Sequence, residues 1–309
     1  MSLALLFPGQ GSQFVGMGRD LADAFPVASR TFEEADDLLG TKLSTLSWEG
    51  PAEELTLTRN AQPAILIHSV AMLRVARDEL GPVACAAGHS LGEFSAWVAA
   101  GTLSFPDALR AVRFRGEQMF AAGELRPGSM AALLGLEDSQ ADALCREASI
   151  RSSDIVVTAN FNSPGQVVVS GDVTAIERIL EMARESGAKK VIPLSVSGAF
   201  HSPLMKPAQS ELEAHLGDVE FSEPAFPVIS NVTARPVTDP GEARELLVEQ
   251  LTSPVRWAES VQAMVEMGVD RFVELGPGNV LTGLNRRNAK GVPSTSLQNP
   301  ADLEAFLGR

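Results

Sequence analysis

The pentapeptide Gly88-His89-Ser90-Leu91-Gly92 decides the fold, because it stands between a small apolar run at 83–87 and a stretch of helical character at 93–100. A Gly-x-Ser-x-Gly pattern between a buried strand and a helix is the signature of a nucleophile elbow. The glycines let strand and helix approach without clashing Cβ atoms, and the strained serine exposes its Oγ above the sheet. The sequence therefore predicts nucleophilic acyl chemistry at Ser90.

The composition is that of a globular protein with room for one large domain, or for a large and a small one. The chain has 309 residues, 45% of them hydrophobic, and a net charge of −14. A negative field repels nucleic-acid phosphates and anionic lipids, so we expect neither as a partner. Two cysteines and a short apolar N-terminal run predict no disulfide framework, metal cluster, signal peptide or membrane span. We expect a cytoplasmic monomer.

The segments around the elbow predict a parallel sheet covered by helices. We expect strands at 3–7, 83–87, 227–230 and 270–275, and helices at 17–39, 51–55, 64–80, 93–100, 105–122, 204–216, 242–250, 257–267 and 280–288. After the first strand, Gly9 and Gly11 suggest a dinucleotide fingerprint, but its third glycine would stand where the chain has Phe14. A loop whose backbone N–H faces a ligand is the better interpretation.

Residues 126–197 have a different pattern from the rest. We expect strands at 129–136, 154–160, 166–170 and 189–195, with helices at 138–149 and 174–186. This βαββαβ order predicts a ferredoxin-like subdomain. It is inserted into an α/β-hydrolase-like catalytic domain that comprises residues 1–125 and 198–309.

A serine nucleophile needs a base, and the chain has four histidines. His68 and His215 fall within predicted helices, and His89 adjoins Ser90, where neighbouring side chains diverge. His201 lies in a Gly- and Ser-rich loop after the insert, the placement typical of a catalytic side chain. Since no acidic residue between Ser90 and His201 stands out, a dyad oriented by a backbone carbonyl is at least as plausible as a triad.

Two arginines follow the elbow on the predicted helix 105–122. Arg113 and Arg115 fall on opposite edges of its apolar stripe. An edge arginine usually extends to solvent, so the helical pattern favours a surface position for either one. The residues alone do not choose between them.

Seven motifs follow one another along nearly the whole chain. They are Phe7-Pro8-Gly9-Gln10-Gly11-Ser12-Gln13, Gln62-Pro63-Ala64, Gly88-His89-Ser90-Leu91-Gly92-Glu93, Arg115-Gly116 with Met119, Asn160-Phe161-Asn162-Ser163-Pro164-Gly165-Gln166, Ala199-Phe200-His201-Ser202 and Glu274-Leu275-Gly276-Pro277-Gly278. Their combination in this order is highly specific, and it resembles the malonyl-CoA:acyl carrier protein transacylase family of fatty-acid synthesis and related polyketide acyltransferase domains.

The resemblance implies a role for each matching residue. Ser90 attacks the thioester, His201 takes its proton, and the backbone carbonyl of Gln250 orients the imidazole. Arg115, rather than Arg113, holds the malonyl carboxylate. The resemblance further implies an oxyanion hole formed by the backbone N–H groups of Gln10 and Leu91. It also implies a substrate pocket without a metal, formed by Gln62, Met119, Asn160, Asn162 and Phe200. Phe200 is almost as plausible in the core.

The implied reaction is a ping-pong transfer of malonyl from malonyl-CoA to the phosphopantetheine thiol of acyl carrier protein, without a bound cofactor. The alternatives are an acyl-thioester or ester hydrolase, a polyketide acyltransferase of different acyl specificity, and a silent carrier-binding protein. Because carrier protein, CoA and this chain are all acidic, docking would need local basic residues. The candidates for such a docking site are Arg184, Lys189, Lys190, Arg286, Arg287 and Lys290. The alternative is that these residues form ordinary solvated surface.

Overall fold

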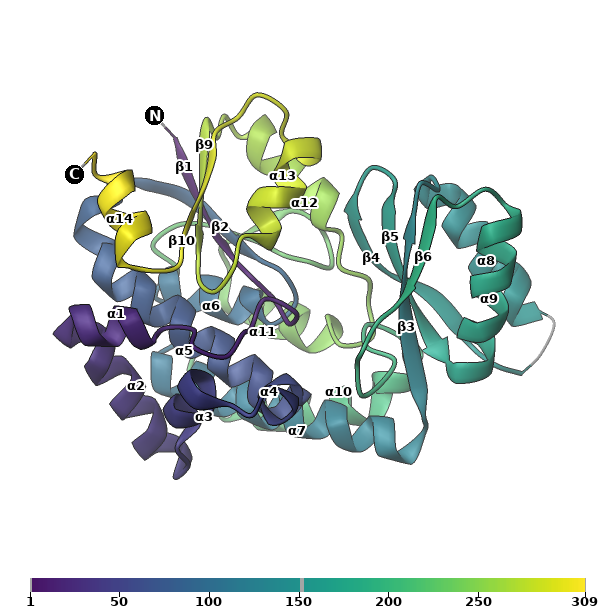
Figure 1. Cartoon of the computed structure of the whole chain (residues 1–309), viewed down its shortest axis with the longest axis horizontal. Helices are drawn as coiled ribbons and strands as arrows, with labels where there is room; N and C mark the ends of the chain where they lie inside the picture. Colours follow the sequence, from purple (N-terminus) through teal and green to yellow (C-terminus); the bar gives the residue numbers. More distant parts are fainter. Residues whose placement is uncertain (1, 151–152, 309) are drawn as a thin grey trace.

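The larger part of the molecule is built on a six-stranded sheet of order β10-β9-β1-β2-β7-β8 (Figure 1). The computed structural model describes residues 2–150 and 153–308. Met1 and Arg309, the first and last residues of the expected catalytic domain, lie outside that description. Residues 151 and 152 of the expected insert do so as well. All neighbouring strands run parallel except β8, which is antiparallel to β7. The strands are β1 (Leu3–Phe7), β2 (Val83–Gly88), β7 (Val228–Ile229), β8 (Pro236–Val237), β9 (Arg271–Leu275) and β10 (Ser294–Leu297).

Strand register brings two loops together at one edge of this sheet. Phe7 at the end of β1 pairs with Gly88 at the end of β2. Since parallel strands end at the same edge, the loop that follows Phe7 lies beside the turn that contains Ser90. The sheet therefore positions the predicted oxyanion loop next to the predicted elbow.

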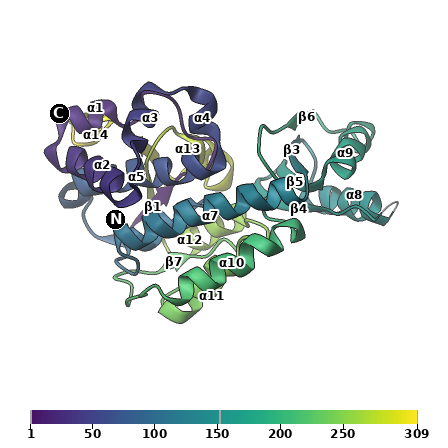
Figure 2. The ribbon, with the colours of Figure 1, turned by 90° about the horizontal axis from the view of Figure 1, so that it is seen from below.

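Helices cover both faces of the large sheet because alternate residues of β1 enter two different cores. Leu3, Leu5 and Phe7 pack with the helices at 19–125 and 206–249, whereas Ala4 and Leu6 pack against α12 and α13. Figure 2 shows α7 and α10 side by side, with α7 reaching the smaller part. The helices are α1 (Arg19–Ala24), α2 (Pro26–Leu39), α3 (Leu43–Glu49), α4 (Ala52–Thr56), α5 (Thr58–Ala76), α6 (Gly92–Ala99), α7 (Phe105–Leu125), α10 (Lys206–Gly217), α11 (Pro240–Glu249), α12 (Trp257–Glu266), α13 (Val280–Asn288) and α14 (Pro300–Phe306), with 3-10 turns η1 (Arg77–Glu79) and η2 (Pro203–Met205).

The smaller part has a sheet and a hydrophobic core of its own. Its four strands lie in the order β4-β5-β3-β6, and every neighbouring pair is antiparallel. The elements predicted for residues 126–197 are present in the predicted order, and α8 and α9 pack on the sheet. They are β3 (Gly128–Leu134), α8 (Asp138–Ile150), β4 (Val156–Ser163), β5 (Gln166–Asp172), α9 (Val173–Glu185) and β6 (Lys190–Pro193).

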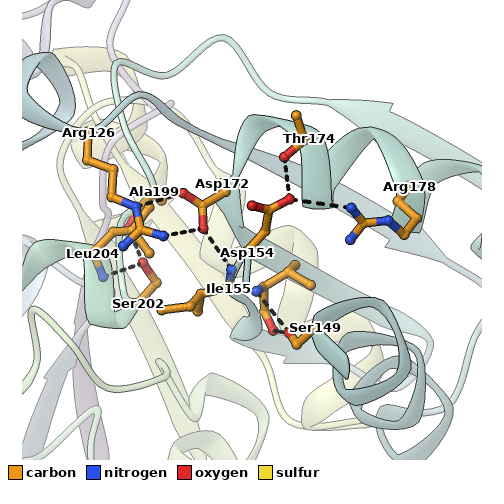
Figure 3. A network of polar contacts seen from close by, with 11 residues as sticks. Arg126, Ser149, Asp154, Ile155, Asp172, Thr174, Arg178, Ala199, Ser202 and Leu204 are labelled. Carbon is orange, nitrogen blue, oxygen red and sulfur yellow. Dashed lines mark hydrogen bonds and ion pairs between the residues drawn. The ribbon is translucent and has the colours of Figure 1, made fainter. Parts of the chain in front are cut away.

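Polar contacts hold the chain where it enters and leaves the smaller part (Figure 3). Arg126, which follows α7, donates through Nε and Nη2 to both carboxylate oxygens of Asp172, each at 2.7 Å. One of these oxygens also accepts from the Ile155 N–H at 2.7 Å. On the return, Ser202 Oγ donates to Ala199 O at 2.6 Å and accepts from the Leu204 N–H at 3.3 Å. Side-chain hydrogen bonds thus hold the chain in place at both of its connections between the larger and the smaller part.

Several predicted boundaries were wrong, and two of them lie near prolines. The predicted helix 17–39 is two helices, because Phe25 before Pro26 takes an extended backbone with φ −126°. The helix predicted to start at 64 begins at Thr58 and contains Pro63. Pro63 cannot donate to the Arg59 carbonyl, which instead accepts from Arg113 Nη1 at 3.0 Å. No sequence pattern predicted α3, β8, β10 or α14.

Candidate active site

Ser90 occupies a sharp turn between β2 and α6, and its φ of +52° lies in the left-handed region. A Cβ on Gly88 would lie 1.9 Å from the carbonyl of Gly92, and one on Gly92 would lie 2.1 Å from the Phe7 oxygen. Both positions therefore exclude any side chain, and the strand, the turn and the helix expected around Ser90 are present.

His201 contacts Ser90 directly. The Ser90 Oγ lies 2.8 Å from His201 Nε2, and His201 Nδ1 lies 2.9 Å from the carbonyl oxygen of Gln250. A carbonyl only accepts, so Nδ1 carries the proton, and Nε2 is left to accept from the serine hydroxyl. Burial and the charge of Arg115 lower the pKa of His201 to about 3, against the effect of the Gln250 carbonyl. The imidazole is therefore neutral at pH 7.

The other three histidines have different partners. His68 Nε2 lies 2.8 Å from the Gln298 oxygen, and the half-buried His215 ring stacks on Phe114 at 4.6 Å between centroids. His89 Nε2 lies 2.8 Å from Asn162 Oδ1, and its ring packs against Trp257. His201 is thus the histidine that bonds Ser90.

Arg115 is fully buried beside the serine. Its Nη2 donates to Ser90 Oγ at 3.1 Å and to Gln250 Oε1 at 3.0 Å, and its Nη1 donates to Gln62 Oε1 at 2.6 Å. The surface position that the helical pattern favoured was wrong for Arg115, because α7 packs against both α5 and α10 and therefore buries more than one of its faces. Burial lowers the pKa of Arg115 to about 10, which still leaves it charged at pH 7.

Arg113 lies elsewhere. Its Nη1 donates to the Arg59 oxygen at 3.0 Å and to Asn60 Oδ1 at 2.9 Å, and its Nε donates to Glu117 at 2.6 Å. It therefore binds the first turn of α5 across the helix interface and does not reach Ser90. The structure brings one of the two arginines to the nucleophile.

Gln10 and Leu91, the residues predicted to form the oxyanion hole, both lie at the space in front of Ser90. Gly9 packs so closely on the elbow that its Cβ would lie 2.5 Å from the His89 oxygen, which places Gln10 beside Leu91. Within the described residues, neither the Gln10 nor the Leu91 N–H donates to a protein acceptor, and both residues line the cavity in front of the serine. The side chain of Gln10 donates to Thr58 Oγ1 at 3.2 Å.

That cavity has a volume of about 250 Å³ and is shared by both parts of the molecule. Four of the predicted substrate-binding residues line it, namely Gln62, Met119, Asn160 and Phe200. Asn162 and Arg115 do not line it. The side chain of Asn162 bonds His89 and its carbonyl oxygen accepts from Asn288 Nδ2, and Arg115 is fully buried. The smaller part contributes Met130 and Asn160, and the segment returning from it contributes 194–196.

Comparisons with known proteins agree with this geometry. Residues 4–299 match the acyl transferase domain family. The chain is 47% identical over 305 residues to the malonyl CoA-acyl carrier protein transacylase of Bacillus subtilis, which covers 99% of this chain and 96% of the relative. The chain belongs to the malonyl-CoA:acyl carrier protein transacylase family.

Solved transacylase structures share the whole fold. The acyl carrier protein S-malonyltransferase of Vibrio cholerae aligns with a TM-score of 0.94 at 44% identity, over 99% of this chain and 100% of the other. A malonyl-transacylase in complex with a type II PKS acyl-carrier protein aligns with a TM-score of 0.95 at 43% identity, over 100% of both chains. The similarity therefore covers both parts of the molecule.

Two residues of this transacylase site were missed as functional by the sequence analysis. Asn231 Oδ1 accepts from the Ser90 N–H at 2.7 Å, and its Nδ2 donates to the Gly88 oxygen at 2.7 Å. Glu93 is fully buried and bonds both Asn231 and Gln250. Glu93 had a signal, its place directly after the elbow. Asn231 had none, because it lies 141 residues from Ser90 in a loop.

In the described part of the chain, no group of three or more His, Cys, Asp and Glu residues is placed to hold a metal ion. Cys85 and Cys145 are both free and buried. In the same residues, no helix is long and apolar enough to cross a bilayer.

Proposed function

We propose that the protein transfers a malonyl group from malonyl-CoA to the phosphopantetheine thiol of acyl carrier protein through a malonyl ester on Ser90. One observation carries the proposal: Ser90 Oγ lies 2.8 Å from His201 Nε2 and 3.1 Å from Arg115 Nη2. A nucleophile, a base and a buried cation therefore meet at one point, as transfer of a carboxylated acyl group requires.

In the first half-reaction, His201 Nε2 takes the proton of Ser90 while Oγ attacks the thioester carbonyl. The two backbone N–H groups of Gln10 and Leu91 stabilise the oxyanion of the tetrahedral intermediate. The C–S bond then breaks, and His201 returns the proton to the CoA thiolate. The Gln250 carbonyl holds the imidazole in the tautomer that this step needs.

In the second half-reaction, the carrier thiol replaces CoA. His201 takes the thiol proton, the thiolate attacks the ester carbonyl, and the oxyanion again forms between the same N–H groups. The C–O bond breaks, and Ser90 recovers its proton from His201. Each step uses only residues of this chain, the malonyl thioester and the carrier thiol, so the proposed transfer calls for no bound cofactor.

Arg115 selects the acyl group. Its guanidinium is held by neutral acceptors, Gln62 and Gln250, so its charge is available to the malonyl carboxylate. Phe200 would narrow the cavity beside the methylene, and Met119 and Asn160 would complete its wall. We assign Asn162 a supporting role through His89 rather than direct contact with substrate.

A hydrolase would use the same dyad with water as acceptor. The buried cation at the nucleophile favours a carboxylated acyl group, and His201 is oriented by a carbonyl instead of the usual acid. A polyketide acceptor is a second candidate, because the transacylase seen with a type II PKS acyl-carrier protein is 43% identical to this chain. A silent carrier-binding protein would not need the assembled dyad.

We infer that residues 1–125 and 198–309 form an α/β-hydrolase-like catalytic domain and that 126–197 form a ferredoxin-like subdomain. The separate core of the smaller part supports the division. The strand order β4-β5-β3-β6 with antiparallel neighbours supports the ferredoxin-like topology, and the elbow at the end of β2 supports the hydrolase-like one.

The carrier protein would dock on basic residues at the junction of the two parts. Lys189 and Lys190 after α9 line one cavity together with Arg287 of α13, so three of the six basic candidates meet there. A positive patch suits an acidic carrier despite the net charge of −14.

A monomer is sufficient for the reaction, since one chain supplies every catalytic group. The free cysteines favour a cytoplasmic location.

Intact-protein mass spectrometry tests the proposal. Malonyl-CoA without carrier protein should leave a malonyl ester on the wild type and none on Ser90→Ala. Adding carrier protein should move the group to its thiol, whereas a hydrolase would release free malonate without any thiol acceptor. An unmodified wild-type protein would refute the covalent mechanism.

A further inference from the structure

The carboxylate of Glu93 has no part in the two half-reactions, although it lies fully buried in the first turn of α6. Its Oε2 accepts from the Asn231 N–H at 3.0 Å and from Gln250 Nε2 at 2.8 Å. Burying a carboxylate is costly, and burial raises the pKa of Glu93 to about 7, against the hydrogen bonds it accepts. A group kept at such a cost next to the nucleophile calls for an explanation.

Gln250 connects this carboxylate to the substrate arginine. Its Nε2 donates to Glu93 Oε2 and, at 3.1 Å, to the Ser90 carbonyl oxygen, while its Oε1 accepts from Arg115 Nη2 at 3.0 Å. A flipped amide would turn its NH2 group toward the guanidinium, which has only donors, and its oxygen toward two acceptors. Since the Asn231 N–H also points at Oε2, this oxygen acts as an acceptor in either protonation state of Glu93.

Glu93 acts on Arg115 through an intervening amide and not by direct contact. Glu93 raises the pKa of Arg115 against the lowering effect of burial, yet no ion pair joins the two side chains within the described residues. A carboxylate bonded directly to the guanidinium would occupy the donors that the substrate carboxylate needs. With Gln250 between them, the guanidinium is oriented by a neutral amide, and no carboxylate of the described residues occupies its donors.

We propose that Glu93 is a positioning residue for acyl selection, which fixes the side-chain amide of Gln250 and thereby holds the Arg115 guanidinium beside Ser90. The proposal rests on the proposed function, in which Arg115 binds the malonyl carboxylate. Glu93 acts as a hydrogen-bond acceptor, and its effect is specific for carboxylated acyl groups.

The test measures Ser90 acylation by malonyl-CoA and by acetyl-CoA, and compares the ratio of the two kcat/KM values. Glu93→Met removes the acceptor at similar size and should lower the malonyl-to-acetyl ratio at least tenfold. Glu93→Gln keeps one acceptor oxygen for Asn231 and Gln250, and should hold the ratio within threefold of wild type. This rescue distinguishes an acceptor from a merely structural residue.

Gln250→Met provides a second variant that leaves the main-chain carbonyl on His201 in place. It should lower the malonyl-to-acetyl ratio as Glu93→Met does. The ratio of the double variant should fall no further, because both changes remove the same connection between Glu93 and Arg115. If Glu93→Met fails to fold, Gln250→Met still tests the amide connection on which the inference depends. Glu274→Met is the matched control: Glu274 is equally buried and accepts from the Leu281 and Thr282 N–H groups, so it should change thermal stability and leave the ratio unchanged.

Three results would overturn the inference: equal loss of both acylations in Glu93→Met, equal loss of the ratio in Glu93→Gln and Glu93→Met, or multiplying effects in the double variant. Each requires a wild type that forms the malonyl ester with a preference over acetyl. A wild type without that ester would instead refute the proposed function, so the two failures are distinguishable.

Discussion

At the scale of residues, Arg113 and Arg115 show how two neighbours in one helix acquire different functions. Arg113 satisfies the carbonyl that Pro63 leaves open in α5, whereas Arg115 turns toward Ser90. Their chemical type is the same, so only their partners distinguish them. The pair therefore supplies a variant and a matched control for the selection of the acyl group.

Arg115→Ala should lower kcat/KM for malonyl-CoA about a hundredfold or more, since two hydrogen bonds to a charged group contribute about 1.5–3 kcal/mol each. Acetyl transfer should persist or increase, because an uncharged acyl group does not use the guanidinium. Steady-state rates with both thioesters measure this. Arg113→Ala should lower stability and keep the malonyl preference; loss of that preference in Arg113→Ala would show that the roles are misassigned.

At the scale of elements, the elbow depends on close contact among β1, β2 and α6. Gly88 and Gly92 bring the strand end and the first helical turn together, and Gly9 brings the oxyanion loop onto the same point. These contacts are backbone to backbone, so no side-chain rearrangement can relieve them. The catalytic geometry is therefore sensitive to a single methyl group at these positions.

Gly92→Ala should destabilise the protein by at least about 1–3 kcal/mol, because its Cβ would lie 2.1 Å from the Phe7 oxygen and force the backbone apart. Gly283→Ala in α13 meets no atom within 4 Å and should instead stabilise it by about 0.5–1 kcal/mol. Urea unfolding of both variants gives the two free energies. Equal stability of Gly92→Ala and wild type would contradict the proposed packing of the elbow.

At the scale of the whole molecule, contacts distant in sequence join the parts around the cavity. The segment returning from the smaller part bonds α5 through Ser197 and Thr58, whose hydroxyl oxygens lie 2.9 Å apart, and β4 forms an isolated bridge from Asn160 to Val255. The C-terminal segment bonds α5 through His68 and Gln298. The stability of the whole fold should therefore respond to the ionisation of buried groups such as His68.

Burial lowers the pKa of His68 to about 4, against the bond to the Gln298 carbonyl. The unfolded chain binds this proton near pH 6.5, so the free energy of unfolding should fall as pH drops from about 6.5 to about 4. For this one group the loss is on the order of 3 kcal/mol. His68→Gln keeps a donor and cannot titrate, so its unfolding free energy, measured by urea unfolding at each pH, should decline less steeply than that of wild type. Parallel pH curves would contradict this prediction.

The sequence by itself determined the elbow, the order of elements in the insert and the position of His201, because these follow from steric rules and periodicity among near neighbours. It did not reveal the short polar strand β10, which becomes a strand only by pairing with β9. Nor could the helical pattern place Arg115, which only the family resemblance singled out, because its acceptors Gln62 and Gln250 lie 53 and 135 residues away. Only the tertiary structure decided which long side chains are buried and what they contact, because burial depends on helices that meet far apart along the chain.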